Sequence, residues 1–382
     1  MPATEAAPPP PFVLHGPGLL DPGSGRIART SLAYAAGRLA GRDAAVGSHA
    51  GEPIEVPADA LIVPGLVDLH AHVFEGVGDG VGADAFCLAR GSTTVVDGGS
   101  AGAATIAAFA AVAGRCRTRV LCWLNLSTIG IIDTRFGELV PGPYLDVAAA
   151  VAAAHARPGF IVGFKARLST YAAGGGVRRV LDGLLEAADA TGLPVMVHVG
   201  DTDEPLADIV RHLRPGDVVT HALTGRKHGI LVADRLDPAV ADAQARGVVF
   251  DAARGANHLS FRVLEAAAEA GFLPDTLSTD MTARMSPVAG YGQVTLGTYL
   301  LSVGIELPDV VSRMTIRPGA VVGLGGEGFA PGDVGDVSVL RLVEGTSEIV
   351  DVDGRTRTVP RRLEAWATVR AGRFAMSDRG HD

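Results

Sequence analysis

The stretch Pro64-Gly65-Leu66-Val67-Asp68-Leu69-His70-Ala71-His72 ends an apolar run with two histidines spaced two residues apart. Side chains of a β-strand alternate between its two faces, so His70 and His72 are expected on the same face. Neutral imidazoles held a few ångströms apart suit a borderline metal ion such as zinc. The stretch therefore predicts the first strand of a buried sheet, with a pair of metal ligands at its end.

Beyond this stretch, short apolar runs alternate with alanine-rich segments. Continuous apolar strands separated by helices indicate a parallel sheet covered on both faces. The predicted strands are Val67–Val73, Thr93–Asp97, Arg119–Ser127, Phe160–Arg167, Pro194–Val199, Val218–Leu223, Val248–Ala252 and Thr276–Met281, and the predicted helices include Gly102–Ala113, Leu145–Ala156, Val177–Thr191 and His258–Ala270. Eight such units predict an α/β fold, a (β/α)8 TIM barrel. A doubly wound open sheet is the alternative, although no G-x-G-x-x-G motif follows the first strand.

The two ends of the chain have a different pattern, with short apolar segments interrupted by glycine and proline. Such punctuation is typical of β-hairpins. Neither end is long enough for a core of its own, so both are expected to build one small β-sandwich beside the barrel. The predicted division is 1–65 and 326–382 for the sandwich and 66–325 for the barrel.

Composition narrows the class of protein. With 47% hydrophobic and 20% charged residues in 382, the chain can bury a large core. A net charge of −9 without basic clusters argues against a nucleic-acid partner. The sequence has no apolar run that would span a membrane. Met1 to Pro11 lacks the basic and apolar regions of a signal peptide, and its Pro8 to Pro11 run is expected to be a flexible lead-in. Its three cysteines fit buried thiols in a reducing cytosol, so we expect a cytoplasmic protein. We also expect that the chain can form a homo-oligomer.

Four further polar residues fall near the ends of later predicted strands: Lys165, His198, His221 and Asp280. The carboxyl ends of barrel strands form the face on which such enzymes build active sites. Each residue alone has an ordinary explanation, such as a core histidine, a helix-capping aspartate or a lysine that reaches solvent. Their convergence with His70 and His72 on one face favours a metal site instead.

These residues resemble the hallmark of the amidohydrolase superfamily: HxH on the first strand, lysine on the fourth, histidines on the fifth and sixth, and aspartate on the eighth. The similarity covers nearly the whole chain. The segments Gly163-Phe164-Lys165-Ala166-Arg167-Leu168-Ser169, His221-Ala222-Leu223-Thr224-Gly225 and Ala256-Asn257-His258 are similar to its amidohydrolase/deacetylase branch, whose members are often labelled dihydroorotase-like.

The resemblance implies two zinc ions per chain. One would be held by His70, His72 and Asp280 and the other by the histidines of the fifth and sixth strands, with carboxylated Lys165 and a hydroxide bridging them. A lysine carbamate is an anionic oxygen donor, whereas an ammonium would be repelled by two dications. The alternative is an unmodified lysine beside a single metal. Asp280 would be the catalytic proton carrier of a hydroxide attack on an amide or ester carbonyl.

Substrate contacts are predicted from three residues that follow strands. Arg167 lies two positions beyond Lys165 and could bind a substrate carboxylate, or pair with an acid from a loop. Asn257 and His258, with Arg254, could line the pocket, although Asn257 could equally cap a helix that begins at His258. The loop 97–102 could cradle an anion or form an ordinary tight turn.

The predicted function is hydrolysis of small N-acyl amino acids or acylated hydroxy acids by a zinc-dependent deacetylase, with a small-molecule substrate that carries a carboxylate. A cyclic amidase of the dihydroorotase or hydantoinase type is the first alternative. True dihydroorotases carry an arginine two positions after the second histidine, where this chain has Phe74. A barrel that binds without catalysis is the second alternative.

Overall fold

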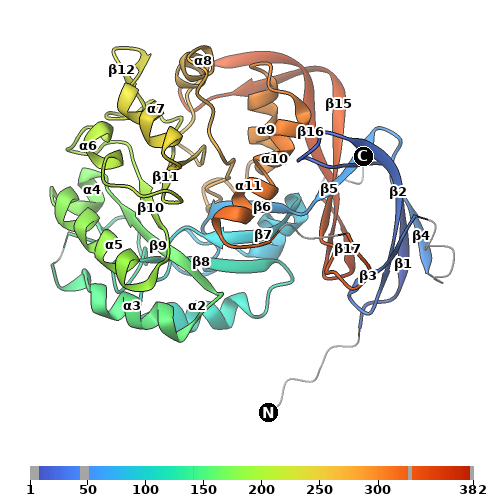
Figure 1. The fold of residues 1–382 in the computed structure, drawn as a ribbon, viewed down its shortest axis with the longest axis horizontal. Coiled ribbons are helices and arrows are strands. Elements are labelled where there is room, and N and C mark those ends of the chain that lie inside the picture. Colours follow the sequence, from blue (N-terminus) through green and yellow to red (C-terminus); the bar gives the residue numbers. More distant parts are fainter. Residues whose placement is uncertain (1–7, 44–50, 141, 326–328, 379–382) are drawn as a thin grey trace.

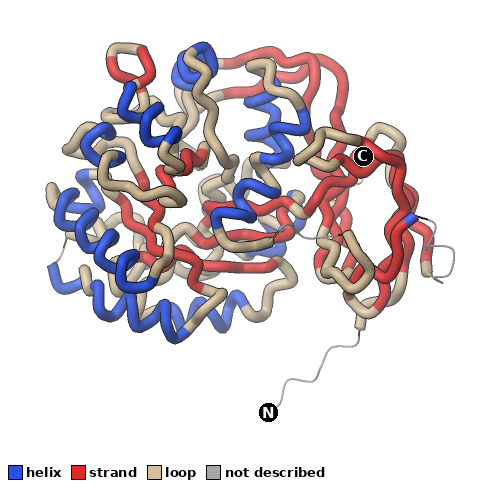
Figure 2. Tube along the Cα trace, in the orientation of Figure 1, coloured by secondary structure: helices blue, strands red, loops and turns tan. Residues whose placement is uncertain are grey.

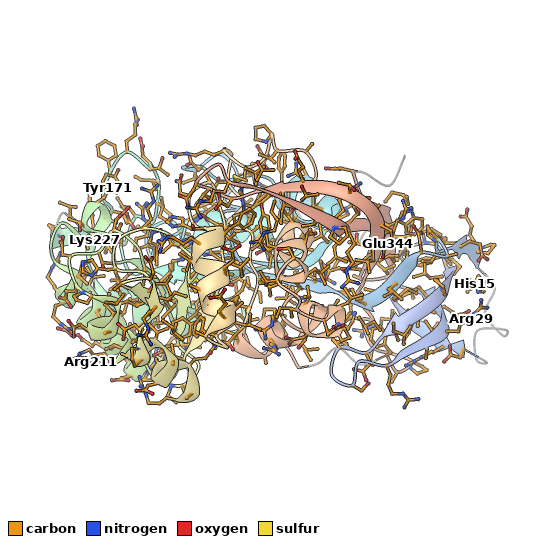
Figure 3. All side chains as sticks on the ribbon, turned by 90° about the horizontal axis from the view of Figure 1, so that it is seen from above. His15, Arg29, Tyr171, Arg211, Lys227 and Glu344 are labelled. Carbon is orange, nitrogen blue, oxygen red and sulfur yellow. The ribbon has the colours of Figure 1, made fainter. Side chains whose placement is uncertain are left out.

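The computed structural model describes residues 8–43, 51–140, 142–325 and 329–378. It has two parts: a parallel sheet surrounded by helices, and a mostly antiparallel sheet built from the two ends of the chain (Figures 1 and 2). Seen from above, His15 and Arg29 lie at the far end of the second sheet, while Tyr171 and Lys227 lie at the opposite end of the molecule (Figure 3). The segment examined for a signal peptide lies largely in residues 1–7, outside the described residues, whereas the expected lead-in Pro8 to Pro11 is described and precedes β1 without forming a helix or strand.

The parallel sheet follows the order of the chain. Its strands are paired in the order β14-β11-β10-β9-β8-β7-β6, without the reversal that a doubly wound sheet would show. Their bounds are β6 Leu66–Ala71, β7 Ser92–Asp97, β8 Arg119–Asn125, β9 Ile161–Arg167, β10 Val195–His198, β11 Val218–Thr220 and β14 Val249–Asp251. Seven of the expected strands are therefore confirmed, most of them shorter at their ends than predicted.

Both faces of this sheet are apolar, as a parallel sheet covered on two sides requires. Phe164 and Val197 pack outward in the large core shared with the helices. The neighbouring side chains Trp123 and Met196 belong to a separate interior cluster. Polar side chains therefore stand out where they interrupt the interior face near the strand ends.

The eighth expected strand, Thr276–Met281, is not assigned as a strand. Two isolated parallel bridges, Asp251↔Thr276 and Ala71↔Met281, join this segment to β14 and to β6. Between them its backbone bonds to side chains: the Thr279 N–H donates to Asp68 at 3.0 Å, and the Leu277 carbonyl accepts from Gln293 at 2.9 Å. Hydrogen bonds to side chains thus replace part of the regular backbone hydrogen bonding between strands. The periodicity of the sequence does not reveal this replacement.

Helices follow most of these strands, and several of them cover the outer side of the sheet (Figure 1). The predicted helix over 177–191 is confirmed to the residue, because its apolar side chains repeat with helical period. The helices are α1 Ala83–Phe86, α2 Ile106–Ala113, α3 Val147–Ala156, α4 Thr170–Ala173, α5 Val177–Thr191, α6 Leu206–Val210, α7 Pro238–Ala245, α8 Phe261–Glu269, α9 Gln293–Leu301, α10 Leu307–Ser312 and α11 Ile316–Val321, with 3-10 turns at Leu88–Arg90 and Gly142–Tyr144 and a small ribbon of β12 Leu231–Val232 and β13 Arg235–Leu236.

The two ends of the chain meet in one eight-stranded sheet, as expected. Its order is β17-β16-β15-β5-β1-β2-β3, with β4 beside β1, and β5 joins the ends by pairing Ile62 with Val339. The strands are β1 Phe12–Leu20, β2 Ile27–Ala35, β3 Arg38–Arg42, β4 Glu52–Glu55, β5 Ala60–Pro64, β15 Val337–Val350, β16 Thr356–Arg370 and β17 Arg373–Met376. Hydrogen bonding shows a single sheet that curls round on itself (Figure 2), so division into two sandwich layers stays a prediction.

Two smaller findings bear on the sequence predictions. Cys87 and Cys122 are buried as expected, whereas Cys116 is only half-buried, and all three are free thiols. Within the described ranges, no helix is both long and apolar enough to cross a membrane.

Candidate metal centre

A cavity of ≈230 Å³ opens where the strands of the parallel sheet end. Its lining contains every residue that the sequence nominated as a metal ligand, and also Arg167, Asn257 and His258. Ligand-type atoms fall into two groups, each with its atoms within 4.8 Å of one another: His70 with His72 and Asp280, and His198 with His221 and His258.

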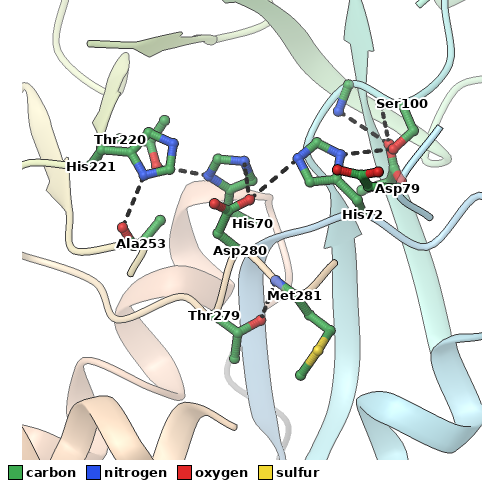
Figure 4. Close-up of polar contacts among 12 residues, drawn as sticks. His70, His72, Asp79, Ser100, Thr220, His221, Ala253, Thr279, Asp280 and Met281 are labelled. Carbon is green, nitrogen blue, oxygen red and sulfur yellow. Dashed lines mark hydrogen bonds and ion pairs between the residues drawn. The ribbon is translucent and has the colours of Figure 1, made fainter. Parts of the chain in front are cut away.

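The first group combines two histidines from the end of β6 with Asp280 from the segment 276–281. His70 lies at the end of β6 and His72 just beyond it, and their rings stand 5.5 Å apart (Figure 4). The Asp280 carboxylate lies 3.4 Å from Nε2 of His72 and 3.7 Å from Nε2 of His70. Asp280 has a φ of +50°, a left-handed conformation that costs energy for a residue with a side chain. Two imidazoles and a carboxylate in this arrangement fit a zinc ion.

The second group contains one histidine more than expected. The His198 and His221 rings lie 4.3 Å apart, and the His258 ring stacks on that of His221 at 3.9 Å. The sequence placed His258 among the substrate contacts, but its ring nitrogen is close enough to the other two to share an ion with them. His221 also has a positive φ, of +67°, so strained backbone occurs in both groups.

Lys165 is buried at 1% exposure on β9. Its Nζ lies 3.1 Å from Nε2 of His70 and 3.2 Å from Sδ of Met196. Burial lowers the pKa of Lys165 to about 7, although the carboxylates of Asp280 and Asp251 oppose the shift. The other lysine of the chain, Lys227, is exposed (Figure 3). The position of Lys165 is thus unfavourable for a permanent ammonium and suits a modified or metal-bound group.

Hydrogen bonds fix which ring nitrogens face the cavity. Nδ1 of His221 lies 2.9 Å from the Ala253 carbonyl, which can only accept, so this nitrogen carries the proton. Nδ1 of His70 lies 2.8 Å from the Thr220 hydroxyl, and that hydroxyl donates its own proton to Asp251 at 2.9 Å. His70 must therefore donate to Thr220. Both rings are left with an unprotonated Nε2, the form that binds a metal.

Burial also keeps the ligands neutral. It lowers the pKa of His70, His198 and His221 well below the usual range, so these rings carry no charge at neutral pH. These three imidazoles therefore need no proton release before a cation binds. Burial also raises the pKa of Asp251, which accepts a hydrogen bond from Thr220, to about 6, although hydroxyl donors from Ser278 and two threonines oppose the shift.

Two glycines make room for the ligands. A Cβ on Gly98 would lie 2.2 Å from Cδ2 of His70, and a Cβ on Gly255 would lie 2.0 Å from a carboxylate oxygen of Asp280. Gly255 also has a φ of +49°, which other residues rarely adopt. Larger residues at either position would displace a ligand of the first group.

Arg167 lines the cavity but has a partner. Its Nε donates to Glu138 at 2.9 Å and a terminal nitrogen donates to the other oxygen of the same carboxylate. Glu138 is 3% exposed and comes from the loop after β8, and the Tyr171 ring lies 5.8 Å from the guanidinium. The ion pair with a loop acid, weighed as the ordinary explanation for this arginine, is thus present. A role in carboxylate binding stays a prediction.

Other sequence interpretations need correction. Asn257 is not a helix cap, because α8 begins at Phe261 with Ser260 at the capping position; Asn257 is exposed at the cavity rim. Arg254 does not line the cavity, and its guanidinium donates to the Val350 carbonyl at 3.2 Å. Phe74 is buried and its ring lies 5.1 Å from that of Phe109, so this position offers no cation to a substrate.

The loop 97–102 is a tight turn and not an anion cradle. The N–H groups of Gly99 and Ser100 donate to the Asp97 carboxylate at 3.1 and 2.6 Å, and that of Gly98 donates to the Ala71 carbonyl. These groups are therefore unavailable to a ligand. The Ser100 hydroxyl instead lies 2.8 Å from Nδ1 of His72.

Sequence reasoning missed Glu138, Thr220 and Asp251. Thr220 and Asp251 could have been found, since both lie at strand ends in the same position as the ligands. Glu138 lies in a loop without periodicity, and only the folded chain brings it to Arg167. Asp79 and Arg284, whose side chains pair at 3.3 Å on the cavity rim, were missed for the same reason.

The chain is similar to known proteins over most of its length. A deacetylase of Brucella anthropi is 32% identical over 340 residues, or 85% of this chain and 84% of that protein. A deacetylase of Agrobacterium fabrum is 33% identical over 352 residues, or 88% and 85% of the two chains. Among solved structures, a dihydroorotase matches with a TM-score of 0.89 and 29% identity over 97% of this chain and 98% of its own, and an adenine deaminase with 0.87 and 25% over 96% and 99%. No protein-family model matches the chain.

Proposed function

Since this chain belongs to the amidohydrolase superfamily and is a hydrolase of that group, we propose that it is a metal-dependent deacetylase. Its substrates would be small N-acyl amino acids or acylated hydroxy acids. The observation that carries the proposal is the meeting of two groups of ligand atoms and a buried lysine in one cavity. The proposal includes a (β/α)8 barrel, with the segment 276–281 as its eighth strand.

We propose a pair of zinc ions at this centre. His70, His72 and Asp280 would hold one, His198 and His221 the other with His258 in reach, and carboxylated Lys165 would connect them. Neutral imidazoles and carboxylate oxygens are ligands that zinc prefers. Carboxylation would replace a poorly solvated amine by an anion among cations, which supports the modification. When bound, the metal would lower the pKa of water and polarise a substrate carbonyl.

The protein's own residues would then divide the remaining work. The Asp280 carboxylate would take a proton from the attacking water and pass it to the leaving nitrogen or oxygen as the acyl bond breaks. Thr220 and the Ala253 carbonyl would hold the rings of His70 and His221, so that the unprotonated Nε2 atoms stay directed toward the metal. Arg167 and Asn257, both on the cavity wall, would orient the substrate.

The relatives favour open-chain acyl substrates, because both are named deacetylases. A cyclic amidase remains the second candidate, since a solved dihydroorotase matches this chain with a TM-score of 0.89. Phe74 weighs against it, because a buried phenylalanine cannot bind the carboxylate of a cyclic ureide. Location in the cytoplasm and assembly into a homo-oligomer stay predictions.

A substrate panel tests the proposal. It should contain N-acetyl amino acids and O-acetyl hydroxy acids as both enantiomers, dihydroorotate, and hydantoins, assayed with zinc-loaded enzyme. We expect hydrolysis of the acetyl compounds and at least 100-fold lower kcat/KM for the rings. Hydrolysis of dihydroorotate or hydantoins without hydrolysis of the acetyl compounds would identify a cyclic amidase and reject the deacetylase. Asp280→Asn should remove turnover in either case.

A further inference from the structure

The β15–β16 hairpin is much longer than the sheet to which it belongs. β15 pairs with β5 only over Val337–Arg341, and β16 pairs with β17 only over Ala367–Arg370. The rest of the hairpin extends over the helical part of the molecule and reaches α8 (Figure 1). Strands of 14 and 15 residues far exceed the usual length of about 5–6. The terminal sheet alone gives no reason for this extension.

The tip of the hairpin holds the segment that carries His258. At one end of that segment, Arg254 donates to the Val350 carbonyl at 3.2 Å. At its other end, the Val352 N–H donates to the Leu259 carbonyl at 3.0 Å, and the Ser260 hydroxyl donates to Asp353 at 2.6 Å. The residues between these anchors are 255–258, on the cavity side.

Asp351 is the centre of this contact. It is 4% exposed, and one carboxylate oxygen accepts the Phe261 N–H at 2.9 Å. The other oxygen accepts the N–H groups of Asp353 and Arg355 at 2.9 and 2.8 Å, which shapes the hairpin turn. The Ser260 side chain makes no cap of its own, so a carboxylate about 90 residues later in the sequence serves the N-terminus of α8.

The consequence reaches the second group of ligands. His258 lies one residue before Leu259, and its ring stacks at 3.9 Å on that of His221. The Ser260 N–H also donates to the Leu223 carbonyl, two residues after His221, so the two loops meet at Ser260. Because the hairpin tip bonds to Leu259 and Ser260, next to His258, a shift of the tip would move His258 relative to His221.

We propose that the hairpin tip is a positioning element for the second metal site and that Asp351 is its key positioning residue. The terminal sheet would thus help to position His258 in the metal centre through this hairpin. This inference rests on the proposed function, since it assigns His258 to the site that would hold the second ion. Asp351 itself touches neither metal nor substrate.

Zinc titration with a competing chelator tests the proposal in the full chain. Asp351→Asn should weaken the second zinc site at least tenfold and leave the first within twofold. Glu344→Gln is the matched control, because it removes the same charge from an exposed position on the same hairpin. His258→Asn should weaken the same site, and adding Asp351→Asn to it should cost less than threefold more. Equal weakening of both sites, or of neither, would overturn the positioning role.

Hydrogen exchange of the metal-free protein separates this inference from the proposed function. Asp351→Asn should speed exchange of the backbone amides of residues 256–261 at least tenfold and leave those of 281–285 unchanged. Faster exchange in a chain that binds a single zinc ion would support the hairpin tip as a positioning element and reject the second metal. Unchanged exchange would reject the positioning role of the hairpin tip. Where Asp351→Asn does not fold, Ser260→Ala removes the contact with Asp353 and is read by the same criteria.

Discussion

Replacing Glu138 by glutamine should destabilise the protein and change its substrate preference. The carboxylate of Glu138 binds two nitrogens of Arg167, and the two side chains are 2% and 16% exposed. Glutamine keeps the shape of the side chain but removes its charge and one of its two acceptors. The guanidinium of Arg167 would then keep a charge in a place with little access to water.

The size of the effect follows from burial. Removing one partner of a buried ion pair costs about 3–5 kcal/mol, since the other charge is left without compensation. Because Arg167 retains some contact with solvent, we expect a smaller cost, about 2–3 kcal/mol, for Glu138→Gln. Arg167→Met leaves the almost fully buried Glu138 carboxylate without its partner, so it should cost about 3–5 kcal/mol. The double variant leaves no charge, so its cost should be clearly below the sum of the two.

Urea unfolding of the two single variants and the double variant, with the native protein, measures this coupling. We expect an interaction free energy of about 2 kcal/mol. Additive effects, with a coupling below about 0.5 kcal/mol, would show that the pair does not act as a unit. Arg135→Met is a suitable control, because Arg135 pairs with Asp133 in the same loop but is 83% exposed.

Catalysis gives a second measurement of the same change. A unit charge about 5 Å from a substrate carboxylate contributes about 3 kcal/mol at an effective dielectric constant of about 20. Freed from Glu138, Arg167 should favour carboxylate substrates, so the ratio of kcat/KM for an N-acetyl amino acid to that for its amide should rise about 100-fold. The rise should vanish when Arg167 is methionine. A ratio that falls in Glu138→Gln would refute the reasoning.

Three further predictions concern the cavity and its support. Arg167→Met should raise KM at least tenfold for carboxylate substrates and little for neutral ones, and equal effects in steady-state kinetics would remove it as the carboxylate anchor. Thr220→Val removes the acceptor of His70 Nδ1–H, so zinc binding at the first group should weaken about 10–100-fold in a chelator competition; unchanged affinity would contradict the tautomer assignment. Asp251 has a pKa of about 6 in the folded chain, above its usual 3.8, so the native state loses stability as pH rises from 4 to 6. Metal-free Asp251→Asn should lack this loss and gain up to about 3 kcal/mol relative to the native protein over that range, whereas parallel curves in urea unfolding would refute the assignment.

Features with a regular period were predictable from the sequence. The helix over 177–191 repeats its apolar side chains every three to four residues, and its bounds agree to the residue. The apolar runs before His70, Lys165 and His198 gave strands, and the position of each polar residue at a strand end gave the face on which it lies. The cavity was therefore predictable because parallel strands bring their ends together.

Features that depend on pairing across the fold were not predictable. The segment 276–281 reads as a strand, yet side chains of Asp68 and Gln293 take part of its backbone bonding. Nothing in the sequence connects Glu138 with Arg167, because a loop carries no register. The role of Asp351 at the start of α8 depends on the path of a hairpin about 90 residues later in the chain.

Elemental analysis of the purified protein with its Lys165→Ala and Lys227→Ala variants tests the central claim most directly. Lys165 is buried among the ligands, and Lys227, the other lysine of the chain, is exposed and serves as the control. We predict two zinc ions per chain in the native protein and in Lys227→Ala, and one or none in Lys165→Ala, with hydrolysis of acetyl substrates lost only there. Full metal content and unchanged turnover in Lys165→Ala would contradict a metal pair connected by this lysine.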